Sequence, residues 1–484
     1  MTVTPQPDIF KAYDIRGIYG EQIDGDLAER IGRAFAGVLS KLAGKPTSEL
    51  RVGLGRDMRL SAPELSARYR DGLLGEGANV IDAGQVGSEM LYFLVGSRKL
   101  DGGLMCTASH NPKAYTGAKL VREGAIPLSG ESGIQDVRRE VEADIGAGGG
   151  TGGDHPDAQP RGSLEEVDIY RDFQAAALRF IDPDLIAARA GRRLKIVLDG
   201  GNGMAGPMVG PLLERLDLDV ITSYWTPDGN FPDHEPNPLL PENRRLIIER
   251  VKDSGADLGI AWDGDADRCF FIDETGAFVD GDFLTALLAE SLLAKAEGSD
   301  PTDPEAVLYD VRASWAVPDT VRRAGGVPFV NRVGHAFFKT RMRAEGSLFG
   351  GEVSGHYYFR DFYCADSGTL PALLVLELLA REGRTMSELL AQYRERYFIS
   401  GEVNSEVADP AAKMEEIAAH FADARQDRLD GISIEYEDWH FNVRPLNTEP
   451  LLRLCLESLI SREDMEARRD EVLALIRSSA TTRS

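Results

Sequence analysis

A hydroxyl group that could carry a phosphoryl group stands in the segment Thr107-Ala108-Ser109-His110-Asn111-Pro112. Ser and Asn side chains bond to local backbone groups and Pro fixes its own φ, so this composition predicts a tight turn. The apolar stretch 102–106 before it predicts a short buried strand. Since α/β proteins hold ligands at strand ends, Ser109 is a candidate for phosphate chemistry. A Ser/Asn cap on a following helix would explain the same residues without a ligand.

Three carboxylates alternate in Asp263-Gly264-Asp265-Ala266-Asp267-Arg268, directly after the strand-like residues 258–262. Carboxylates this close repel one another unless a cation lies among them, and hard oxygen ligands favour Mg²⁺ or Ca²⁺. An EF-hand would offer Glu274 at its twelfth position, but it needs Gly where Arg268 stands and a helix before the loop. A phosphatase with an aspartate nucleophile, or a solvated acidic loop, would also place carboxylates after a strand.

Two further loops carry polar side chains suited to a sugar phosphate. In the glycine-flanked segment 350–356, Glu352 and Ser354 could bond to neighbouring sugar hydroxyls. In the segment 444–450, Arg444, Asn447 and Thr448 could grip a phosphate, with the planar guanidinium forming paired bonds. Each of these loops alone could equally be an ordinary turn.

The elements that must position these loops alternate between short apolar strands and helix-period stretches. Strands at 51–54 and 79–81 and helices at 27–42, 62–74 and 88–95 predict a mostly parallel sheet covered by helices. The pattern recurs twice, in strands 194–198, 257–262 and 306–309, helices from about 207 and 241, and helix 372–381. The end of the chain instead predicts an α+β module of helix 411–424, strands 432–437, 439–443 and 451–457, and helix 464–476.

A glycine-rich stretch, 146–162, reads as a linker that closes the first α/β unit. We therefore predict three similar mixed α/β domains and a smaller C-terminal α+β domain. Their expected ranges are 1–150 with the Ser109 loop, 163–277 with the acidic loop, 278–395 with the Glu352 loop, and 396–484 with the Arg444 loop.

Composition limits the possible partners. The 484 residues carry a formal charge of −25 without a basic stripe, which argues against nucleic acid, and an anionic substrate would need a local cluster of Arg and Lys. Four scattered cysteines indicate buried thiols rather than a zinc site or a disulfide framework. Residues 1–14 lack a targeting pattern and no uncharged apolar run reaches about 18 residues, so we expect a cytoplasmic, soluble protein with no membrane partner.

The four loops, in this order over nearly the whole chain, resemble those of the α-D-phosphohexomutase family, in its bacterial phosphomannomutase/phosphoglucomutase branch. Further matching segments are 11–17, 55–59, 199–203, 228–232 and 310–312. The resemblance implies a heart-shaped, four-domain enzyme with one active-site loop from each domain. It also implies interconversion of hexose 6-phosphate and hexose 1-phosphate through an enzyme phosphoserine, with Mg²⁺ as cofactor and hexose 1,6-bisphosphate as intermediate and activator.

The resemblance extends to individual residues. Ser109 resembles the phosphorylated serine, and Asp263, Asp265 and Asp267 resemble the Mg²⁺ ligands, with the phosphoserine touching the cation. Glu352 and Ser354 resemble the pair that reads the sugar. Further positions resemble parts of the active site, namely Arg444, Asn447 and Thr448 in a distal phosphate clamp, and Tyr13, Arg16, Lys119, Arg268, His335 and Lys339.

The identity of the general acid/base stays open at this point. His335 is the first candidate, because an imidazole titrates near neutral pH, and a structural histidine is the alternative. His110, beside Ser109, is a candidate to orient the phosphate.

Two departures from the family pattern concern the clamp and the lysine loop. Leu446 stands where the family commonly has Ser, and backbone amides or Arg453 could compensate. Thr116-Gly117 stands where Asn-Gly often precedes the active-site Lys119.

Two rival functions stay open. A phosphoglucosamine mutase would usually carry Gln where Val353 stands, and a non-catalytic sugar-phosphate binder would not need the intact serine and aspartates. The resemblance leaves the preferred hexose, and the choice between monomer and dimer, undecided.

Overall fold

The computed structural model describes residues 7–130, 132–146, 160–187, 191–296, 303–446 and 451–478. The chain folds into two compact units. The first comprises residues 1–279, 339–344 and 355–386, and the second comprises residues 280–338, 345–354 and 387–484.

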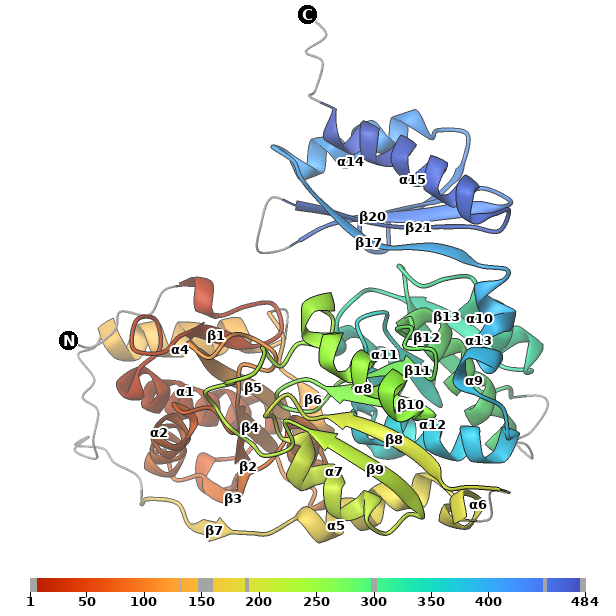
Figure 1. The fold of residues 1–484 in the computed structure, drawn as a ribbon. Coiled ribbons are helices and arrows are strands. Elements are labelled where there is room, and N and C mark those ends of the chain that lie inside the picture. The colour runs from red at the N-terminus through yellow and green to blue at the C-terminus, as the bar shows by residue number, and fades with distance from the viewer. Residues whose placement is uncertain are drawn as a thin grey trace, which may run out of the picture. The chain divides into compact units, whose positions relative to one another are not determined.

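A seven-stranded sheet in the order β1-β5-β4-β2-β3-β7, with β6 beside β5, forms the first part of the first unit (Figure 1). β4, β2, β3 and β7 run parallel, whereas β5 pairs antiparallel with β4, β1 and β6. The sequence predicted a mostly parallel sheet, whereas the observed sheet is mixed. The reason is that residues 107–114 reverse the chain directly into β5 without a helix. The strands are β1 (Ile15–Ile18), β2 (Arg51–Arg56), β3 (Asn79–Gln85), β4 (Gly102–Cys106), β5 (Tyr115–Arg122), β6 (Ile126–Pro127) and β7 (Leu164–Glu166).

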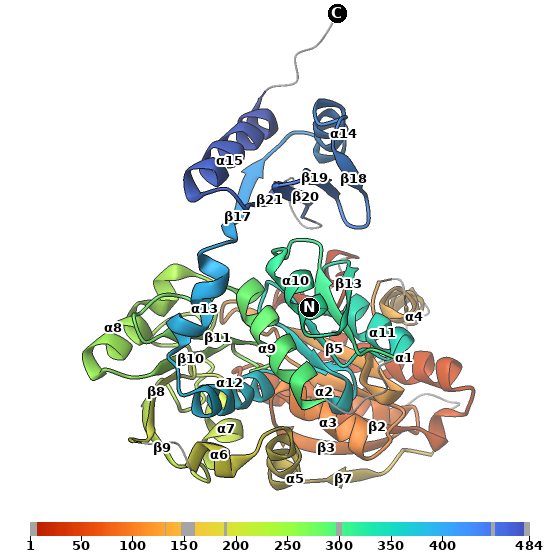
Figure 2. The same ribbon diagram turned by 90° about the vertical axis from the view of Figure 1, so that its right-hand side faces the viewer.

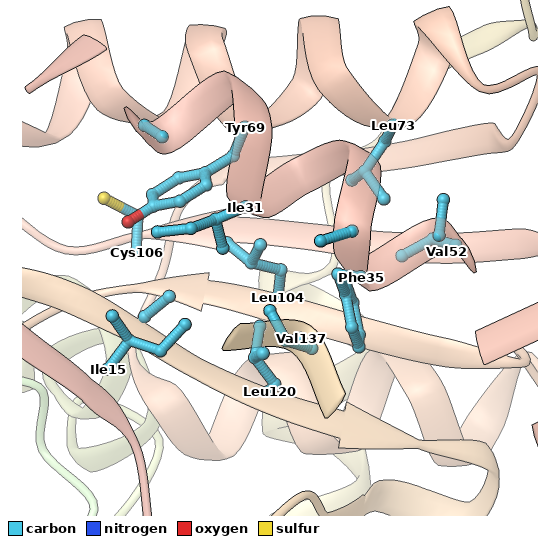
Figure 3. Packing of buried hydrophobic residues seen from close by; sticks show 14 of the residues in the cluster. Ile15, Ile31, Phe35, Val52, Tyr69, Leu73, Leu104, Cys106, Leu120 and Val137 are labelled. Carbon is cyan, nitrogen blue, oxygen red and sulfur yellow. The ribbon is translucent and has the colours of Figure 1, made fainter. Parts of the chain in front are cut away.

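The helices of this part are η1 (Pro7–Ile9), α1 (Gly25–Ala43), η2 (Thr47–Glu49), α2 (Ala62–Gly75), α3 (Ser88–Ser97), η3 (Glu123–Ala125) and α4 (Ile134–Gly146). Asp24 caps the start of α1, because its side chain accepts the Leu27 N–H at 2.8 Å. Figure 3 shows Ile31 and Phe35 of α1 and Tyr69 of α2 against Leu104 of β4, all buried. This apolar contact helps to position β4, whose carboxyl end carries the Ser109 turn.

The predicted linker, 146–162, lies mostly outside the described residues, which omit 147–159. After it, β7 pairs with β3 in the first sheet, although residues 164–166 fall inside the range predicted for the second domain. Backbone pairing, which the short polar sequence of β7 does not signal, attaches this strand to the first sheet.

A four-stranded sheet in the order β11-β10-β8-β9 carries the acidic loop (Figure 1). β10, β8 and β9 are parallel and β11 is antiparallel to β10, so Asp263 to Arg268 form the turn of a strand pair. The elements are α5 (Tyr170–Ala177), η4 (Leu178–Phe180), α6 (Pro183–Ala187), β8 (Leu194–Asp199), α7 (Ala205–Leu213), β9 (Leu218–Ser223), η5 (Pro241–Arg244), α8 (Arg245–Ser254), β10 (Leu258–Trp262) and β11 (Cys269–Asp273).

The chain between residues 281 and 394 contributes to both units. In the second unit, parallel strands β13 (Val327–Asn331), β12 (Ala306–Asp310) and β14 (Phe349–Gly351) lie side by side. In the first unit, β15 (Tyr357–Phe359) and β16 (Ala365–Asp366) pair antiparallel. The helices of this stretch are α9 (Gly281–Lys295), α10 (Ala316–Arg323), α11 (His335–Glu345), η6 (Arg360–Phe362), α12 (Thr369–Glu382) and α13 (Met386–Arg394).

The C-terminal part is an antiparallel sheet in the order β17-β21-β20-β19-β18, with α14 and α15 on one face (Figure 2). Its elements are β17 (Phe398–Glu406), α14 (Pro410–His420), β18 (Arg425–Asp427), β19 (Ile432–Glu435), β20 (Trp439–Pro445), β21 (Leu451–Ser458) and α15 (Arg462–Arg477). α14 ends at His420 rather than at the predicted residue 424, because Phe421 leaves the helix to pack edge-on against Phe441, 5.2 Å between ring centroids. Among the described residues, no helix is both long and apolar enough to span a bilayer.

Candidate active site

Ser109 lies in the turn between β4 and β5, only 4% exposed, with φ at 50° in the left-handed region that non-glycine residues rarely adopt. Its backbone N–H donates to Thr107 Oγ1 at 2.8 Å, and that hydroxyl donates to Asp57 Oδ2 at 2.7 Å. The element that follows is the strand β5, so a helix cap is excluded. The turn therefore presents the hydroxyl from a fixed, unusual backbone conformation.

Arg59 stabilises this turn through hydrogen bonds to its backbone. Its guanidinium, in a residue 1% exposed, donates to four carbonyl oxygens of the turn at 2.6–3.1 Å, those of Ser109, Asn111, Pro112 and Tyr115. Asp57 Oδ1 accepts the Arg59 N–H at 3.0 Å. Carbonyls that a tight buried turn would leave unpaired are thereby satisfied. Residues 55–59 matched the family in the sequence, but the sequence assigned them no role. Their place at the end of β2, which pairs with β4, could have indicated that they support the Ser109 turn.

Asp263, Asp265 and Asp267 form a buried cluster after β10, with carboxylate oxygens within 4.8 Å of one another. Among the described residues, Oδ1 of both Asp265 and Asp267 is buried and receives no hydrogen bond. Unsatisfied, closely spaced carboxylate oxygens fit a hard divalent cation. The burial excludes a solvated acidic loop, and the preceding strand excludes an EF-hand.

The Ser109 turn meets this cluster directly. Ser109 Oγ donates to Asp263 Oδ2 at 2.9 Å. A Cβ atom at Gly264 would lie 2.6 Å from the Ser109 carbonyl oxygen, so the two backbones approach this closely only because residue 264 is glycine.

Lys119, on β5, and Ser88, the first residue of α3, bind the same carboxylates. Lys119 Nζ donates to Oδ2 of both Asp265 and Asp267, and Ser88 Oγ donates to Asp265. Burial acts to raise the pKa of Asp265, but the charge of Lys119 and the hydrogen bonds from Lys119 and Ser88 together lower that pKa. Burial raises the pKa of Asp263 to about 6, against the opposing effect of Arg268. Asp265 is thus held as a carboxylate, the form a metal ligand needs.

Cationic side chains surround Ser109, as an anionic substrate of an acidic protein requires. Arg268 Nε and Nη2 donate to Asp263 Oδ2 at 2.9 and 2.8 Å, and Nη2 also contacts His110 Nδ1. His110 Nδ1 lies 3.3 Å from Ser109 Oγ. Burial, followed by the charges of Arg268 and Arg16, lowers the pKa of His110 well below its usual value, so its imidazole is neutral.

Arg16 is the second residue of β1, and Tyr13 lies in the chain leading into that strand. Arg16 Nη1 donates to Asn111 Oδ1 at 2.6 Å and its Nη2 contacts Asp14, which ties β1 to the Ser109 turn. Tyr13 is half-buried in the turn before β1. Arg16 is therefore next to the predicted phosphate carrier.

Lys339, on α11, is fully buried in the first unit. Its Nζ pairs with Asp366 Oδ1 at 2.6 Å and lies 3.7 Å from the centroid of the Tyr92 ring. Asp366 Oδ2 also lies 2.9 Å from His356 Nδ1. Burial would lower the pKa of His356, but the hydrogen bond with Asp366 raises it.

Glu89, the second residue of α3, is a buried contact that the sequence did not reveal. Its carboxylate accepts the hydroxyls of Ser367 and of Thr369, the latter at 2.5 Å. Between those two residues, Gly368 accepts the Trp262 Nε1–H at 3.1 Å. α3 thus contacts both the acidic cluster, through Ser88, and the start of α12, through Glu89. Only the predicted helix start at residue 88 could have drawn attention to this pair.

Glu352 lies in the second unit, directly after β14, and is buried. Its Oε1 accepts the Gly334 N–H at 2.8 Å, which joins its loop to the residue before His335 at the start of α11. Asp310 Oδ2 accepts the N–H of Val353 at 3.0 Å. Arg312 pairs with Asp310 at 2.8 Å and lies 4.0 Å from Glu352. The sequence matched 310–312 to the family without giving these residues this supporting role.

Arg444 lies at the end of β20, 3.5 Å from Asp430, whose other carboxylate oxygen accepts the Val333 N–H at 2.8 Å. The second unit thus joins the Arg444, His335 and Glu352 loops, with Ser354 half-buried in the last of these.

The predicted clamp can be followed only in part. Asn447 and Thr448 lie outside the described residues. The Arg453 guanidinium binds Asn404 Oδ1 at 3.0 Å and Glu402 at 3.1 Å on β17, and its suggested compensation for Leu446 stays a prediction.

Family models match all four parts of the chain. They are described as phosphoglucomutase/phosphomannomutase alpha/beta/alpha domain I (residues 7–145), domain II (171–276), domain III (280–397) and C-terminal domain (402–475). The chain belongs to the phosphoglucomutase/phosphomannomutase family. The predicted resemblance and fold class are confirmed, with three α/β domains followed by a C-terminal domain.

Individual members of the phosphoglucomutase/phosphomannomutase family match over almost their full length. A phosphomannomutase of Salmonella montevideo is 42% identical over 478 residues, which is 97% of this chain and 99% of that protein. Phosphohexose mutases of Xanthomonas campestris pv. campestris are 42% identical over 471 residues, with the same coverage. The crystal structure of a Burkholderia thailandensis family protein superposes with a TM-score of 0.84 at 30% identity, covering 98% of this chain and 97% of that one.

Proposed function

We propose that this phosphohexomutase interconverts hexose 6-phosphate and hexose 1-phosphate, with mannose and also glucose as the sugar, through a phosphorylated Ser109. The observation that carries the proposal is the hydroxyl of Ser109, 2.9 Å from Asp263 in a buried acidic cluster and surrounded by Arg16, Lys119 and Arg268. Few other reactions need a buried hydroxyl, a cation site and cationic side chains in one place.

The chain's own residues account for the phosphoryl transfer. The P–O bond to Ser109 breaks while the phosphorus bonds to a hydroxyl oxygen of the bound hexose phosphate, and the hydroxyl proton passes to a base. The product of this step is a hexose 1,6-bisphosphate. Transfer of its other phosphoryl group back to Ser109 rephosphorylates the enzyme and releases the isomeric monophosphate. Arg268 and Arg16 neutralise charge on the transferring group, which is the main demand of this chemistry.

Asp263, Asp265 and Asp267 are the residues that would hold Mg²⁺, because two of their oxygens are buried and unsatisfied in the described structure. The ion supplies charge neutralisation at the phosphate on Ser109 when it is bound. Lys119 and Ser88 keep Asp265 oriented and ionised for this purpose.

The sugar is read by the second unit in this proposal. Glu352 and Ser354 bond to hydroxyls near the middle of the ring, which superpose approximately after the intermediate turns over, so the contacts survive the exchange of its ends. In this arrangement few contacts are made to the hydroxyl at C2, where mannose and glucose differ. Arg444, Asn447 and Thr448 grip the distal phosphate, and Tyr13 and Lys339 complete the substrate contacts.

His335 is the proposed general acid/base for the sugar hydroxyl. Its support is its position at the start of α11, after Gly334, whose N–H binds the sugar-reading Glu352. His110, neutral and 3.3 Å from Ser109 Oγ, is proposed to orient the phosphate and the serine hydroxyl.

We further propose that the enzyme acts in the cytoplasm, as a monomer or a dimer, on free sugar phosphates. Its four cysteines are buried free thiols, as a reducing compartment allows.

The proposal is tested by turnover on mannose 1-phosphate, glucose 1-phosphate and glucosamine 1-phosphate, each with Mg²⁺ and a trace of glucose 1,6-bisphosphate. We expect efficient isomerisation of the first two and poor isomerisation of the third. Preference for glucosamine 1-phosphate would assign the rival phosphoglucosamine mutase activity. Tight binding of all three without any isomerisation would instead indicate the non-catalytic sugar-phosphate binder.

A further inference from the structure

A cavity of about 630 Å³ lies at the C-terminal end of α3, inside the first unit. The end of α3, the α5–η4 segment and the η6 turn supply its walls, so three distant parts of the chain build it. The volume is in the range of small-molecule sites. The residues assigned to the mutase reaction do not line it.

The floor of the cavity is aromatic. Phe93 and Phe362 are buried, and both pack edge-on against Phe173, with ring centroids 5.9 and 6.3 Å away. The Tyr363 ring lies against α3 at Gly96, where an added Cβ would come within 2.4 Å of ring atoms. Phe93 and Phe362 thus support the half-buried rings of Phe180 and Tyr363, which also line the cavity. These two rings offer surface against which a planar ligand can pack at little cost in side-chain entropy.

The turn that carries Tyr363 is held in an uncommon conformation. Tyr363 and Cys364 both have positive φ, at 58° and 50°, in a segment without glycine. Arg343 Nη2 donates to the carbonyl oxygens of Tyr363 and Gly124, which keeps the turn in place. Consecutive left-handed non-glycine residues cost free energy and concentrate at binding and catalytic sites.

The rim of the cavity is charged. Arg179 is exposed, and no ion pair or hydrogen bond of its guanidinium occurs within the described ranges. Arg98 stands on the same rim, 3.1 Å from Glu165. Asp172 and Asp361 add carboxylates that can accept hydroxyl or amino protons. The rim thus combines a site for an anion with acceptors for neutral donors.

We propose that this cavity binds a nucleoside phosphate. A base, a ribose and a phosphate match in turn the aromatic floor, the carboxylates and the two arginines, whereas a sugar phosphate would leave the floor unused. The α3 residues that line the cavity, Phe93 and Ser97, lie about 7.5 and about 13.5 Å along the helix from Ser88, and no residue of the acidic cluster lines it. The ligand therefore binds together with the sugar substrate, not in place of it.

Isothermal titration of the full-length, Mg²⁺-loaded enzyme tests the proposal, with ADP and GDP as probes and the active site saturated with glucose 1,6-bisphosphate. We expect one site for at least one nucleotide, and weaker binding of adenosine, guanosine or inorganic phosphate alone. Arg179→Ala should weaken binding roughly tenfold, the loss of one charge-assisted contact. Ala176→Trp, which fills the cavity, should abolish it.

Arg171→Ala is the matched control, because Arg171 is an exposed arginine of α5 outside the cavity, and it should bind the nucleotide like the wild type. Mutase turnover of each variant checks that it is folded. The proposal is overturned if neither nucleotide binds, if the sugar bisphosphate displaces the nucleotide, or if folded Arg179→Ala and Ala176→Trp variants bind as well as the control.

Discussion

The buried carboxyl group of Glu89 joins α3 to the start of α12 through the hydroxyls of Ser367 and Thr369. Burial raises the pKa of Glu89 to about 8, because the two hydroxyls only partly compensate for the loss of water. The folded protein therefore binds this proton more tightly than the unfolded chain, where the ordinary value of 4.5 applies. The resulting stabilisation is complete below about pH 4.5 and is lost as the pH rises through 8.

Glu89→Gln removes this dependence, since an amide keeps the hydrogen-bonding shape and has no proton to lose. Relative to the variant, the wild type should lose up to about 1.4 kcal/mol of unfolding free energy per pH unit between pH 5 and 8. Urea unfolding at several pH values measures the difference. Glu49→Gln, which changes an exposed carboxyl group, is the control and should leave the slope of the wild type intact. Parallel pH profiles for wild type and Glu89→Gln would contradict a buried protonated Glu89.

Single residues with reactive groups could be predicted from the sequence, but their supports could not. Ser109 and the three aspartates stand in short segments whose composition indicates turns and cation binding. Arg59, Ser88 and Glu89 act across 50 to 280 positions of chain, as in the contacts Arg59–Ser109 and Glu89–Thr369. Such contacts depend on which strands and helices become neighbours, and no local pattern encodes that.

At the scale of elements, the site depends on two loops that follow strands of different sheets, β4 and β10, and touch at one glycine. Gly264 stands where a side chain would meet the Ser109 carbonyl oxygen at 2.6 Å. The loops after β4 and β10 can therefore bring hydroxyl and carboxylate together only while this position lacks a Cβ.

Gly264→Ala should push the two loops apart. We expect a loss of about 1–3 kcal/mol in unfolding free energy, as for other overpacked sites, and at least a tenfold fall in kcat. Thermal unfolding and steady-state kinetics measure both. Gly37→Ala in α1 is the matched control, because nothing lies within 4 Å of its new methyl group, and it should be slightly stabilising. Wild-type stability and turnover in Gly264→Ala would refute the close approach.

Element types followed from periodicity, whereas pairing did not. The strands at 51–56, 102–106, 194–199 and 258–262 and the helices at 25–43 and 62–75 lie where apolar spacing predicted them. β5 reverses direction because a turn with Asn and Pro feeds it, and β7 joins the first sheet by backbone bonds alone. Both outcomes depend on the partner strand, which sequence spacing leaves open.

At the scale of the whole molecule, a chain with a net charge of −25 gathers Arg16, Lys119 and Arg268 around Ser109 and His110. These side chains give a phosphate on Ser109 cationic partners beside the acidic cluster, as an anionic substrate of an acidic protein requires. In the second unit, hydrogen bonds through Gly334 and Asp430 join the predicted sugar loop, the His335 loop and Arg444. Loops from distant parts of the sequence are thus assembled within each unit.

The phosphorylation state of Ser109 tests the proposed mechanism most directly. After incubation with Mg²⁺ and glucose 1,6-bisphosphate, intact mass and peptide mass spectrometry should find one phosphoryl group, on the peptide that contains Ser109. Ser109→Ala should carry none and should lose mutase turnover almost completely. A phosphoryl group on another residue, or undiminished turnover in Ser109→Ala, would contradict the proposed mechanism.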